Sequence, residues 1–218
     1  MITLIIITIL IVLFWWIKRI ILEANKTDWH VAWLNYLEGL NQLFCKYYHR
    51  LECSKPIDLP KNGPAIVVSN HLSGLDGFLL VAASRRPIRF LIAREEYERF
   101  GLQWLFRATG CIPVDRSRHA EIALRAALRT LEAGEVLAIF PQSTFVLPGN
   151  SRRLKRGSIW LAKQMNCPVY PVHLSGIKGA GHVVRGVFWR SKAKLVTYPP
   201  LNLDDENHLQ YLQSLLEG

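Results

Sequence analysis

Cysteine is scarce in this sequence, with four residues in 218, and no two of them stand in the C-x-x-C spacing of a metal or redox site. The spacing therefore argues against a metal centre, and we expect no metal ligands in the chain. Reduced thiols packed in a core are typical of a reducing compartment. The four residues are Cys45, Cys53, Cys111 and Cys167. Internal repeats and low-complexity tracts are also missing, and 218 residues suffice for one domain with a full core and an appended segment.

Acidic residues are few. Seventeen Asp and Glu stand against 27 Lys and Arg, which gives a net charge of +10 and predicts an anionic partner. The sequence contains neither zinc-finger spacing nor the aromatic motif of RNA-binding sheets, so we expect no nucleic acid partner. A membrane surface fits the excess of positive charge better. The basic residues cluster at 85–89, 116–118, 152–156 and 178–194.

The N-terminal apolar run lacks the positive leading region and the small-residue cleavage site of a secretory signal peptide. We therefore expect residues 2–22 to be a retained membrane anchor. Sixteen helical residues cover about 24 Å against a hydrocarbon core of roughly 30 Å, so the pattern leaves open whether the anchor spans the bilayer or lies in one leaflet. Trp15-Trp16 followed by Lys18-Arg19 predicts an inner (cytoplasmic) membrane with the rest of the chain on the cytoplasmic side.

Residues 28–50 are expected to form a second helix, with Thr27 or Asp28 as its N-cap. Aromatic and leucine side chains recur there at helical spacing. They are Trp29, Trp33, Leu37, Leu40, Phe44 and Tyr47. Such a stripe is typical of a face packed on a core, with a position at the lipid interface as the alternative.

Beyond residue 60 the chain alternates between strand-like and helix-like stretches. The strands are expected at 65–69, 88–93, 111–114, 136–140, 168–174 and 194–198, and the helices at 75–84, 97–108, 118–133 and 155–165. This alternation predicts an α/β fold with a mixed, mostly parallel sheet flanked by helices. The proline- and glycine-containing segment after residue 57 is expected to divide the chain into an N-terminal membrane part, 1–57, and a second domain, 58–218.

The stretch from Asn70 to Asp76 follows the apolar run at 65–69 and carries an imidazole and a carboxylate five residues apart. On one continuous helix such residues differ by about 140° and do not meet. The spacing works if His71 lies in a strand-to-helix turn and Asp76 in the first turn of the helix. Asp76 can then hold one ring nitrogen while the other acts as a general base. Ser73, the alternative nucleophile, lacks the G-x-S-x-G elbow of a serine hydrolase.

Three further blocks end at or beside predicted strands. Residues 110–116 place Arg116 just after a short strand, and arginine suits forked contact with phosphate. Residues 140–144 run from a buried strand into a polar turn. Residues 167–172 form an apolar strand with two prolines, which can wall a pocket.

In this order the four blocks resemble the motifs of the glycerolipid acyltransferase family, in particular its 1-acylglycerol-3-phosphate acyltransferases. The resemblance covers about residues 60–175. It implies that His71 and Asp76 are catalytic and deprotonate the acceptor hydroxyl, and that Arg116 holds the acceptor's phosphate. Arg94 stands where the family usually has a lysine. The substrate-binding residues expected on this basis are Asn70, Arg94, Gly110, Arg116, Gln142, Ser143, Thr144, Lys155, Arg156 and Pro171.

The third block departs from the family, which usually has Phe-Pro-Glu-Gly-Thr-Arg where this chain has residues 140–145, Phe-Pro-Gln-Ser-Thr-Phe. Gln142 lacks the charge, Ser143 lacks glycine's freedom at positive φ, and Phe145 replaces an arginine credited with phosphate binding. The basic residues at 152–156 are candidates to replace that cation.

The resemblance implies direct acyl transfer from acyl-CoA or acyl carrier protein, used as a co-substrate with no further cofactor, to the hydroxyl of a lysophospholipid. The most direct product is phosphatidic acid, made from 1-acylglycerol-3-phosphate. The altered third block leaves two alternatives: a different acceptor such as a lyso-aminolipid, or a non-catalytic lipid-binding protein of the same fold. Membrane lipids are the expected partners.

Overall fold

A computed structural model describes residues 1–115, 120–147 and 149–218. Its helices are α1 (Ile2–Ala24), α2 (Ala32–Leu43), the π-helix η1 (Phe44–Tyr48), α3 (Asp76–Ala83), α4 (Arg94–Tyr97), α5 (Gln103–Ala108), α6 (Ala120–Glu132), α7 (Gly157–Met165), α8 (Val183–Phe188) and α9 (His208–Glu217). Its strands are β1 (Glu52–Cys53), β2 (Ala65–Ser69), β3 (Ile88–Ala93), β4 (Ile112–Val114), β5 (Val136–Ile139), β6 (Val169–Ser175) and β7 (Lys194–Thr197).

Within the described residues the strands form one seven-stranded sheet in the order β1-β7-β6-β2-β5-β3-β4. The pairs are parallel except β6 with β7, which is antiparallel. The predicted mixed, mostly parallel α/β fold is therefore confirmed. β2 lies in the middle of the sheet between β5 and β6, so its carboxyl end opens where a parallel sheet normally carries its ligand site.

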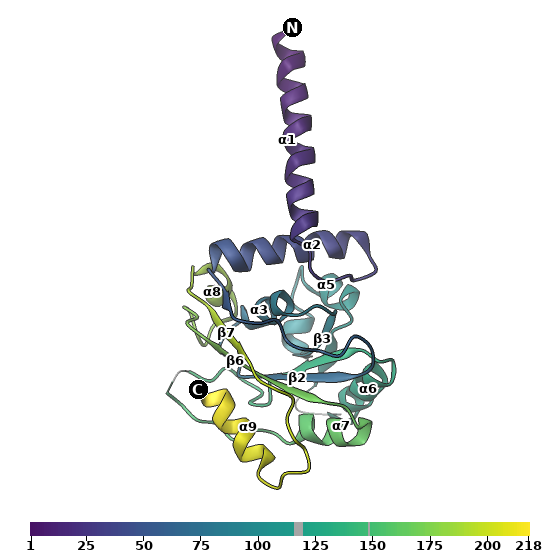
Figure 1. The fold of residues 1–218 in the computed structure, drawn as a ribbon, viewed down its shortest axis with the longest axis vertical. Coiled ribbons are helices and arrows are strands. Elements are labelled where there is room, and N and C mark those ends of the chain that lie inside the picture. Colours follow the sequence, from purple (N-terminus) through teal and green to yellow (C-terminus); the bar gives the residue numbers. More distant parts are fainter. Residues whose placement is uncertain (116–119, 148) are drawn as a thin grey trace.

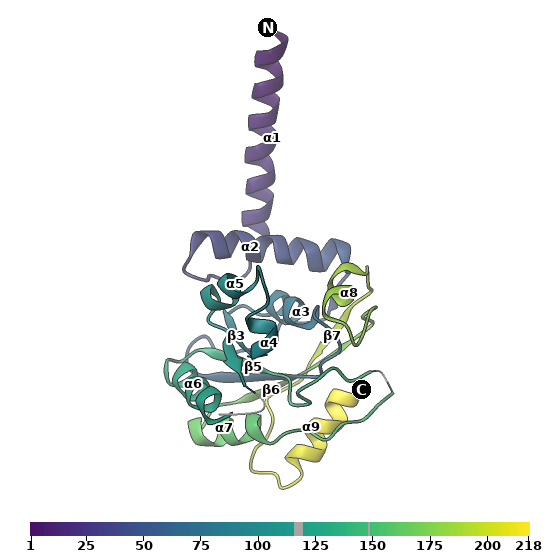
Figure 2. The ribbon, with the colours of Figure 1, turned by 180° about the vertical axis from the view of Figure 1, so that it is seen from behind.

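The sheet is covered on both faces, which explains why β2 is an uninterrupted apolar run. Ala65 and Val67 pack into one core cluster with α3, whereas Ile66 and Val68 pack into another with α6, α7 and α9. Figures 1 and 2 show α3 on the side of the sheet that faces α2, with α7 and α9 on the opposite side.

The predicted strands recur with shifts of at most one residue at either end, but one predicted helix is divided. Residues 97–108 were expected to be continuous, and instead α4 ends at Tyr97 and α5 begins at Gln103. Gly101 lies between them at φ 82°, a left-handed conformation that no α-helix contains. The short elements β1 and α8 and the terminal helix α9 were not predicted.

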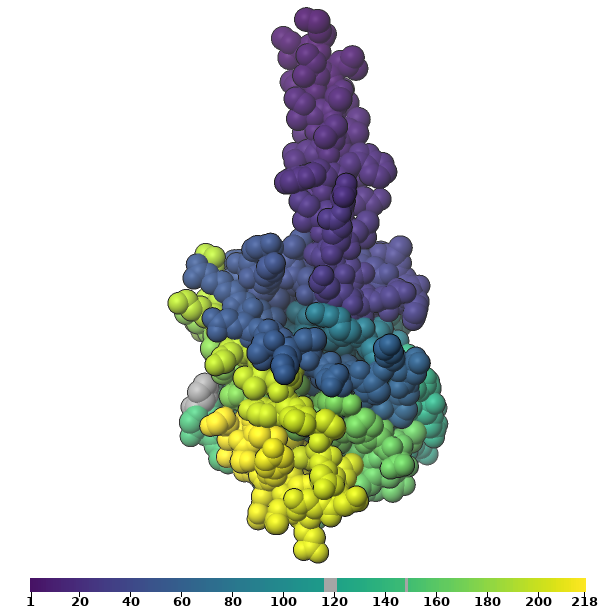
Figure 3. Space-filling view, in the orientation of Figure 1, coloured from purple at the N-terminus to yellow at the C-terminus, as the bar shows by residue number. Residues whose placement is uncertain are grey.

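α1 projects from the domain as a single rod (Figures 1 and 3). It has 23 residues, and the most apolar 18-residue stretch has a mean hydropathy of 2.4. Among the described residues it is the one helix that is long and apolar enough to cross a membrane. At 1.5 Å per residue it reaches about 34 Å, enough for the hydrocarbon core. α1 crosses α2 at Gly39, where an added Cβ would overlap the carbonyl oxygen of Ile21.

α2 begins later than expected. Its N-cap is Val31, so neither Thr27 nor Asp28 caps it, and that prediction is wrong. Asp28 instead accepts hydrogen bonds from the backbone N–H of His30 (2.8 Å) and from Asn35 Nδ2 (3.0 Å). His30 has φ 58°, which ends any helical path through residues 28–31.

The aromatic stripe faces the core only in part. Trp29 is buried and Phe44 packs against a core cluster, whereas the other members are partly or largely exposed, so the first expectation holds for these two residues alone. The buried residues of α2 are Leu34, Glu38 and Gly39, whereas Trp33 and Leu40 are exposed and Tyr47 of η1 is 62 % exposed. The reason is local: α2 turns polar groups toward α3, with Asn41 Nδ2 donating to the Phe78 carbonyl at 3.0 Å.

One strand of the sheet, β1, belongs to the N-terminal part of the chain, residues 1–57. β1 pairs with β7 through Glu52–Lys194 and Cys53–Leu195. A domain boundary at residue 57 stays a prediction.

Candidate active site

The turn between β2 and α3 brings the histidine and the aspartate together. His71 lies two residues beyond the end of β2, and Asp76 is the first residue of α3. His71 Nδ1 is 2.7 Å from Asp76 Oδ2. The predicted placement of this pair, across a strand-to-helix turn, is confirmed. Nε2, the second ring nitrogen, points away from the carboxylate.

The turn's own backbone immobilises the carboxylate. Asp76 is fully buried, and its Oδ2 accepts hydrogen bonds from the N–H groups of Leu72 (2.6 Å) and Ser73 (3.0 Å) as well as from the imidazole. The Ser73 hydroxyl adds a longer bond of 3.4 Å to Oδ1. Hydrogen bonds to a charged acceptor are the strong class, so the carboxylate has little freedom to move. The Ser73 side chain is buried in this network.

Two aromatic rings lie against the imidazole. Phe140 stacks on His71 with a centroid distance of 4.0 Å and an interplanar angle of 14°. Phe145 lies at 4.5 Å and 55°. The imidazole remains 20 % exposed. The sequence marks Phe145 only as a missing arginine and gives Phe140 no role, although both are apolar and stand at the two ends of residues 140–145.

The third block packs beneath the turn that carries His71. Gln142 is buried and its Oε1 accepts the His71 backbone N–H at 3.0 Å. Val146 N–H donates to the His71 carbonyl at 2.8 Å. Ser143 adopts φ 59°, the left-handed conformation that favours glycine. Thr144 is half-buried beside them. Gln142 and Ser143 thus contribute to the shape of the turn, whatever they contribute to substrate binding.

Asn70 and Pro171 are buried in the sheet. The Asn70 side chain bonds the backbone of Leu174 in both directions, donating from Nδ2 at 2.8 Å and accepting at Oδ1 at 2.7 Å. Pro171 lies in β6 opposite Val68 of β2. These contacts hold β6 against the end of β2, and a role of either residue in substrate binding stays a prediction.

The expected cations occupy different places. Arg94 begins α4, pairs with Glu98 at 3.8 Å, and lines a small cavity with Pro113 and Asp115 of the second block. Lys155 and Arg156 are exposed just before α7. Arg116 lies outside the described residues.

Gly110 has a structural reason for being glycine. It has φ 68°, and a Cβ there would lie 3.0 Å from the Arg89 side chain. Arg89 makes a two-pronged ion pair with Glu135, at 2.9 and 2.7 Å, and donates to the Thr109 carbonyl at 2.6 Å. The guanidinium therefore cannot move aside without losing these contacts.

The thiols are packing groups, as expected. Cys45, Cys111 and Cys167 are buried and Cys53 is half-buried, and all four are free. Burial raises the pKa of each thiol, to about 12 at Cys45 and about 11 at Cys167. Among the described residues, no three His, Cys, Asp or Glu side chains come together where they could hold a metal ion.

Comparison with known proteins gives one family. The model of the Acyltransferase family matches residues 50–175, which include the His71 turn, the second and third blocks and all of β6. The 1-acyl-sn-glycerol-3-phosphate acyltransferase of Bacillus subtilis is 24 % identical over 153 residues, 70 % of this chain and 74 % of that protein. A probable 1-acyl-sn-glycerol-3-phosphate acyltransferase of Mycoplasma genitalium is 30 % identical over 128 residues, 56 % of this chain but only 47 % of that protein.

A solved structure shares the fold. The crystal structure of the 1-acyl-sn-glycerophosphate (LPA) acyltransferase PlsC from Thermotoga maritima superposes with a TM-score of 0.63 at 22 % identity, covering 84 % of this chain and 77 % of that one. The family match ends at residue 175, so α8, β7 and α9 lie beyond it.

Proposed function

The chain belongs to the acyltransferase family, and we propose that it transfers a fatty acyl group from a thioester donor to the free hydroxyl of a membrane lysophospholipid. We assign 1-acylglycerol-3-phosphate as the acceptor and phosphatidic acid as the product. The observation that carries the acyl transfer is the His71–Asp76 pair, with Nδ1 held at 2.7 Å and Nε2 turned away from the carboxylate. The choice of acceptor is supported by the relatives from Bacillus subtilis and Mycoplasma genitalium, which are named for 1-acyl-sn-glycerol-3-phosphate.

His71 is the proposed general base. Nε2 takes the proton of the acceptor hydroxyl while that oxygen attacks the carbonyl carbon of the thioester. Asp76 holds the imidazole in the tautomer with its proton on Nδ1, and it stabilises the imidazolium that forms. The tetrahedral intermediate then expels the donor's sulfur, which takes the proton from His71 and leaves as a thiol. Backbone N–H groups of the second and third blocks are the proposed donors to the oxyanion.

The donor is acyl-CoA or acyl carrier protein, and the chemistry requires no cofactor beyond that co-substrate. Arg94, Arg116, Lys155 and Arg156 are the proposed cations for the phosphate groups of acceptor and donor. With α1 in an inner membrane and the catalytic domain on its cytoplasmic side, the base meets a soluble donor and a membrane acceptor at one surface.

A second acceptor class has one specific observation in its favour. Phe145 lies 4.5 Å from the His71 ring at the position where the family usually has a phosphate-binding arginine. An apolar ring beside the base favours an acceptor without phosphate, such as a lyso-aminolipid. A protein that binds lipid without turnover is the remaining alternative.

An acyl-transfer assay with the full chain in phospholipid vesicles tests the assignment. Purified protein would receive acyl-CoA or acyl carrier protein thioester with a panel of lyso-lipids, and products would be resolved by mass spectrometry. We expect acylation of 1-acylglycerol-3-phosphate above every other acceptor, and none with His71→Ala. Preference for a phosphate-free acceptor would favour the second class, and inactivity on the whole panel would favour the lipid-binding alternative.

A further inference from the structure

We propose that Gly186 of α8 is a positioning residue for the acyl transfer. Its bare backbone lies against Ser73 in the catalytic turn, residues 70–76, and so fixes the Asp76 carboxylate beside the proposed base. This role rests on the proposed function, because it gives α8 a part in the same reaction. α8 begins at Val183, beyond residue 175, where the match to the family model ends.

α8 and the catalytic turn approach each other more closely than side chains would allow. A Cβ on Gly186 would overlap Cβ and Oγ of Ser73, and a Cβ on Gly74 would overlap the Val183 carbonyl. A side chain at either glycine would therefore push the turn and α8 apart. The two segments touch through their backbones, which is a use of glycine that no other residue can replace.

Hydrogen bonds between backbone groups join the two segments at the same place. Gly181 N–H donates to the Leu72 carbonyl at 2.7 Å, and Gly74 N–H donates to the His182 carbonyl at 3.4 Å. The catalytic turn is thus bonded to the residues just before α8 and packed against α8 itself. A displacement of α8 is passed directly to the turn.

Ser73 connects this contact to the reacting pair. Its N–H donates to Asp76 Oδ2 at 3.0 Å and its hydroxyl to Oδ1 at 3.4 Å, and Oδ2 lies 2.7 Å from His71 Nδ1. The Ser73 hydroxyl also accepts the Leu75 N–H at 3.1 Å. Because Ser73 is fully buried among these partners, a group that pushes it aside moves the carboxylate as well. The imidazole then loses the alignment that a general base needs.

The end of η1 holds α8 from the other side. His49, just after η1, is fully buried, and its Nε2 lies 3.0 Å from the carbonyl of Val187, the neighbour of Gly186. A carbonyl oxygen only accepts, so Nε2 carries a proton. The Tyr48 hydroxyl donates to the Phe188 carbonyl at 2.6 Å. α8 is therefore fixed between η1 and the catalytic turn.

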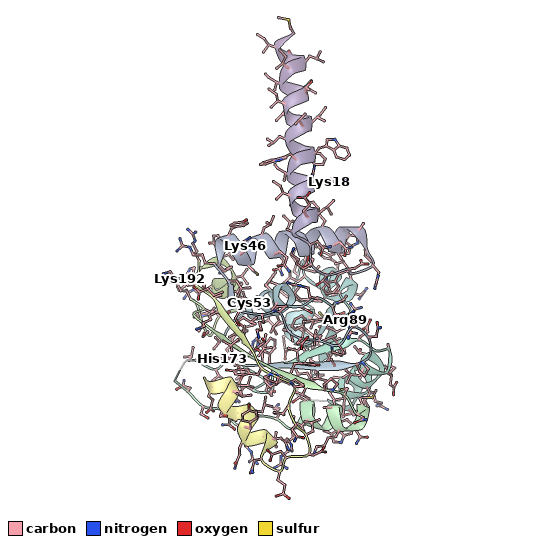
Figure 4. The ribbon with its side chains drawn as sticks, in the orientation of Figure 1. Lys18, Lys46, Cys53, Arg89, His173 and Lys192 are labelled. Carbon is pink, nitrogen blue, oxygen red and sulfur yellow. The ribbon has the colours of Figure 1, made fainter. Side chains whose placement is uncertain are left out.

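The segment that contains α8 is also closed at its base. Lys178 N–H donates to the Ser191 hydroxyl at 2.9 Å, and that hydroxyl donates to the Trp189 carbonyl at 3.0 Å. Figure 4 shows Lys46 of η1 and Lys192 toward the same side of the molecule, where Figure 1 shows α8. These contacts keep α8 from swinging away from the turn that it supports.

Substitution of Gly186 tests the support. Alanine is the better helix former, so Gly186→Ala disturbs the molecule through the contact with Ser73 and not through helix propensity. Ser73→Gly removes the two atoms that the added methyl would overlap, so the double variant Gly186→Ala/Ser73→Gly restores the fit. Val184→Ala, at an exposed position of the same helix, is the matched control. All would be full chains assayed in the same vesicles, with thermal melting to verify folding.

We expect Gly186→Ala to lower kcat about 10–100-fold while the KM of acceptor and donor changes less than about twofold, because the base and not the bound lipid is displaced. Val184→Ala should match the wild type, and the double variant should match Ser73→Gly alone. A folded Gly186→Ala protein with the kcat of the wild type would overturn the positioning role. So would a loss confined to KM, or a double variant slower than both single variants, since independent effects add.

A second pair of variants acts from the η1 side and decides the matter if Gly186→Ala does not fold. His49→Leu removes the donor to the Val187 carbonyl, whereas His49→Gln keeps an amide N–H that can donate. We expect kcat to fall several-fold in His49→Leu and to be largely retained in His49→Gln, with the KM unchanged in both. Equal kcat in the two folded variants would overturn the support of the turn from η1 through α8.

A spectroscopic readout does not depend on turnover. The proton that His71 Nδ1 donates to Asp76 should give a low-field NMR resonance, assigned by its absence in His71→Gln. It should be unchanged in Val184→Ala and shifted or broadened in Gly186→Ala. An unchanged resonance in folded Gly186→Ala would overturn the positioning role. A wild type that shows the resonance but transfers no acyl group would contradict the proposed function instead, and the resonance in Gly186→Ala would then decide the positioning of the pair by itself.

Discussion

Phe145 is the residue whose observed position adds most to what the sequence predicts. In the sequence, Phe145 only replaces an arginine that the family usually has. In the structure, its ring lies 4.5 Å from the His71 ring and helps to enclose the proposed base. The pairing of His71 with Asp76 followed from their spacing, because a five-residue separation fits a strand-to-helix turn. The stacking of Phe140 and Phe145 did not follow, since it depends on how residues 140–146 fold back on the turn.

Phe145→Arg should lower the KM for 1-acylglycerol-3-phosphate about tenfold, because a charge-assisted contact with phosphate contributes roughly 1.5–3 kcal/mol. Phe145→Leu, which removes the ring and adds no charge, is the control and should not lower the KM. Steady-state kinetics of both variants on vesicles makes the comparison. If Phe145→Arg raises the KM for 1-acylglycerol-3-phosphate while the wild type prefers a lyso-aminolipid, the natural acceptor is a lipid without phosphate.

Asp76→Asn should reduce kcat by about 10³–10⁴, as the loss of a carboxylate that fixes the tautomer of a catalytic histidine does in other hydroxyl-activating sites. The amide can still accept one of the N–H bonds now made by Leu72 and Ser73, so the fold should persist. Steady-state kinetics measures the loss of kcat, and thermal melting shows separately whether the variant is still folded. A folded Asp76→Asn protein with near-normal kcat would remove Asp76 from the mechanism.

At the scale of elements, α2 departs most from what the sequence predicts. Five of the six residues that repeat at helical spacing lie in α2 and η1, and Trp29 precedes them, but periodicity does not say which neighbour a helix meets. Two contacts decide the orientation of α2: the crossing of α1 at Gly39 and the polar contacts of Asn41 and Gln42 with α3. The helix start was also misjudged, because Asp28 and Asn35 bond each other across residues 28–35.

Gly39→Ala should destabilise the α1–α2 crossing by about 1–3 kcal/mol, the usual cost of overpacking a close contact. The added methyl would meet the backbone of Ile21, which cannot swing aside as a side chain can. Gly157→Ala is the matched control, because a Cβ there has no described atom within 4 Å. Thermal unfolding in detergent micelles measures both. Equal melting temperatures for the two variants would contradict the close crossing.

The buried His49 predicts a pH dependence of stability. Burial holds its pKa below the usual value of about 6.5, while its Nε2 bonds the Val187 carbonyl at 3.0 Å. The unfolded chain therefore binds a proton at a higher pH than the folded chain does. The contribution of His49 is complete above pH 6.5 and is lost as the pH falls through that value. His173, whose pKa burial also lowers, acts in the same direction.

Melting temperature followed between pH 7.5 and 6.0 should therefore decline in the wild type and decline less in His49→Gln. His173→Gln provides the comparison for the second histidine. This range stays well above the usual pKa of carboxyl groups. Burial raises the pKa of Glu38, which acts in the opposite direction, because the folded chain then binds a proton at a higher pH than the unfolded chain does. An unchanged slope in both variants would mean that neither histidine is responsible.

For the whole molecule, alternation of strands and helices was enough to predict the mixed, mostly parallel sheet, but not the strand order that places β2 in its middle. It was not enough to predict β1 or α8, because two and six residues carry too little periodicity to recognise. Yet α8 joins η1 to the His71 turn, through Phe188 on one side and Gly186 on the other. The sequence thus predicts the reacting groups, whereas the structure gives their position relative to the N-terminal helices.

The central claim is that His71, held by Asp76, is the base of an acyl transfer to 1-acylglycerol-3-phosphate. The most direct test is the rate of phosphatidic acid formation by wild type and His71→Ala, both as full chains in the same vesicles and both verified as folded and membrane-bound. The account predicts turnover by the wild type and a loss of at least about a thousandfold in the variant, with binding to vesicles unchanged. Substantial turnover by folded His71→Ala would contradict it.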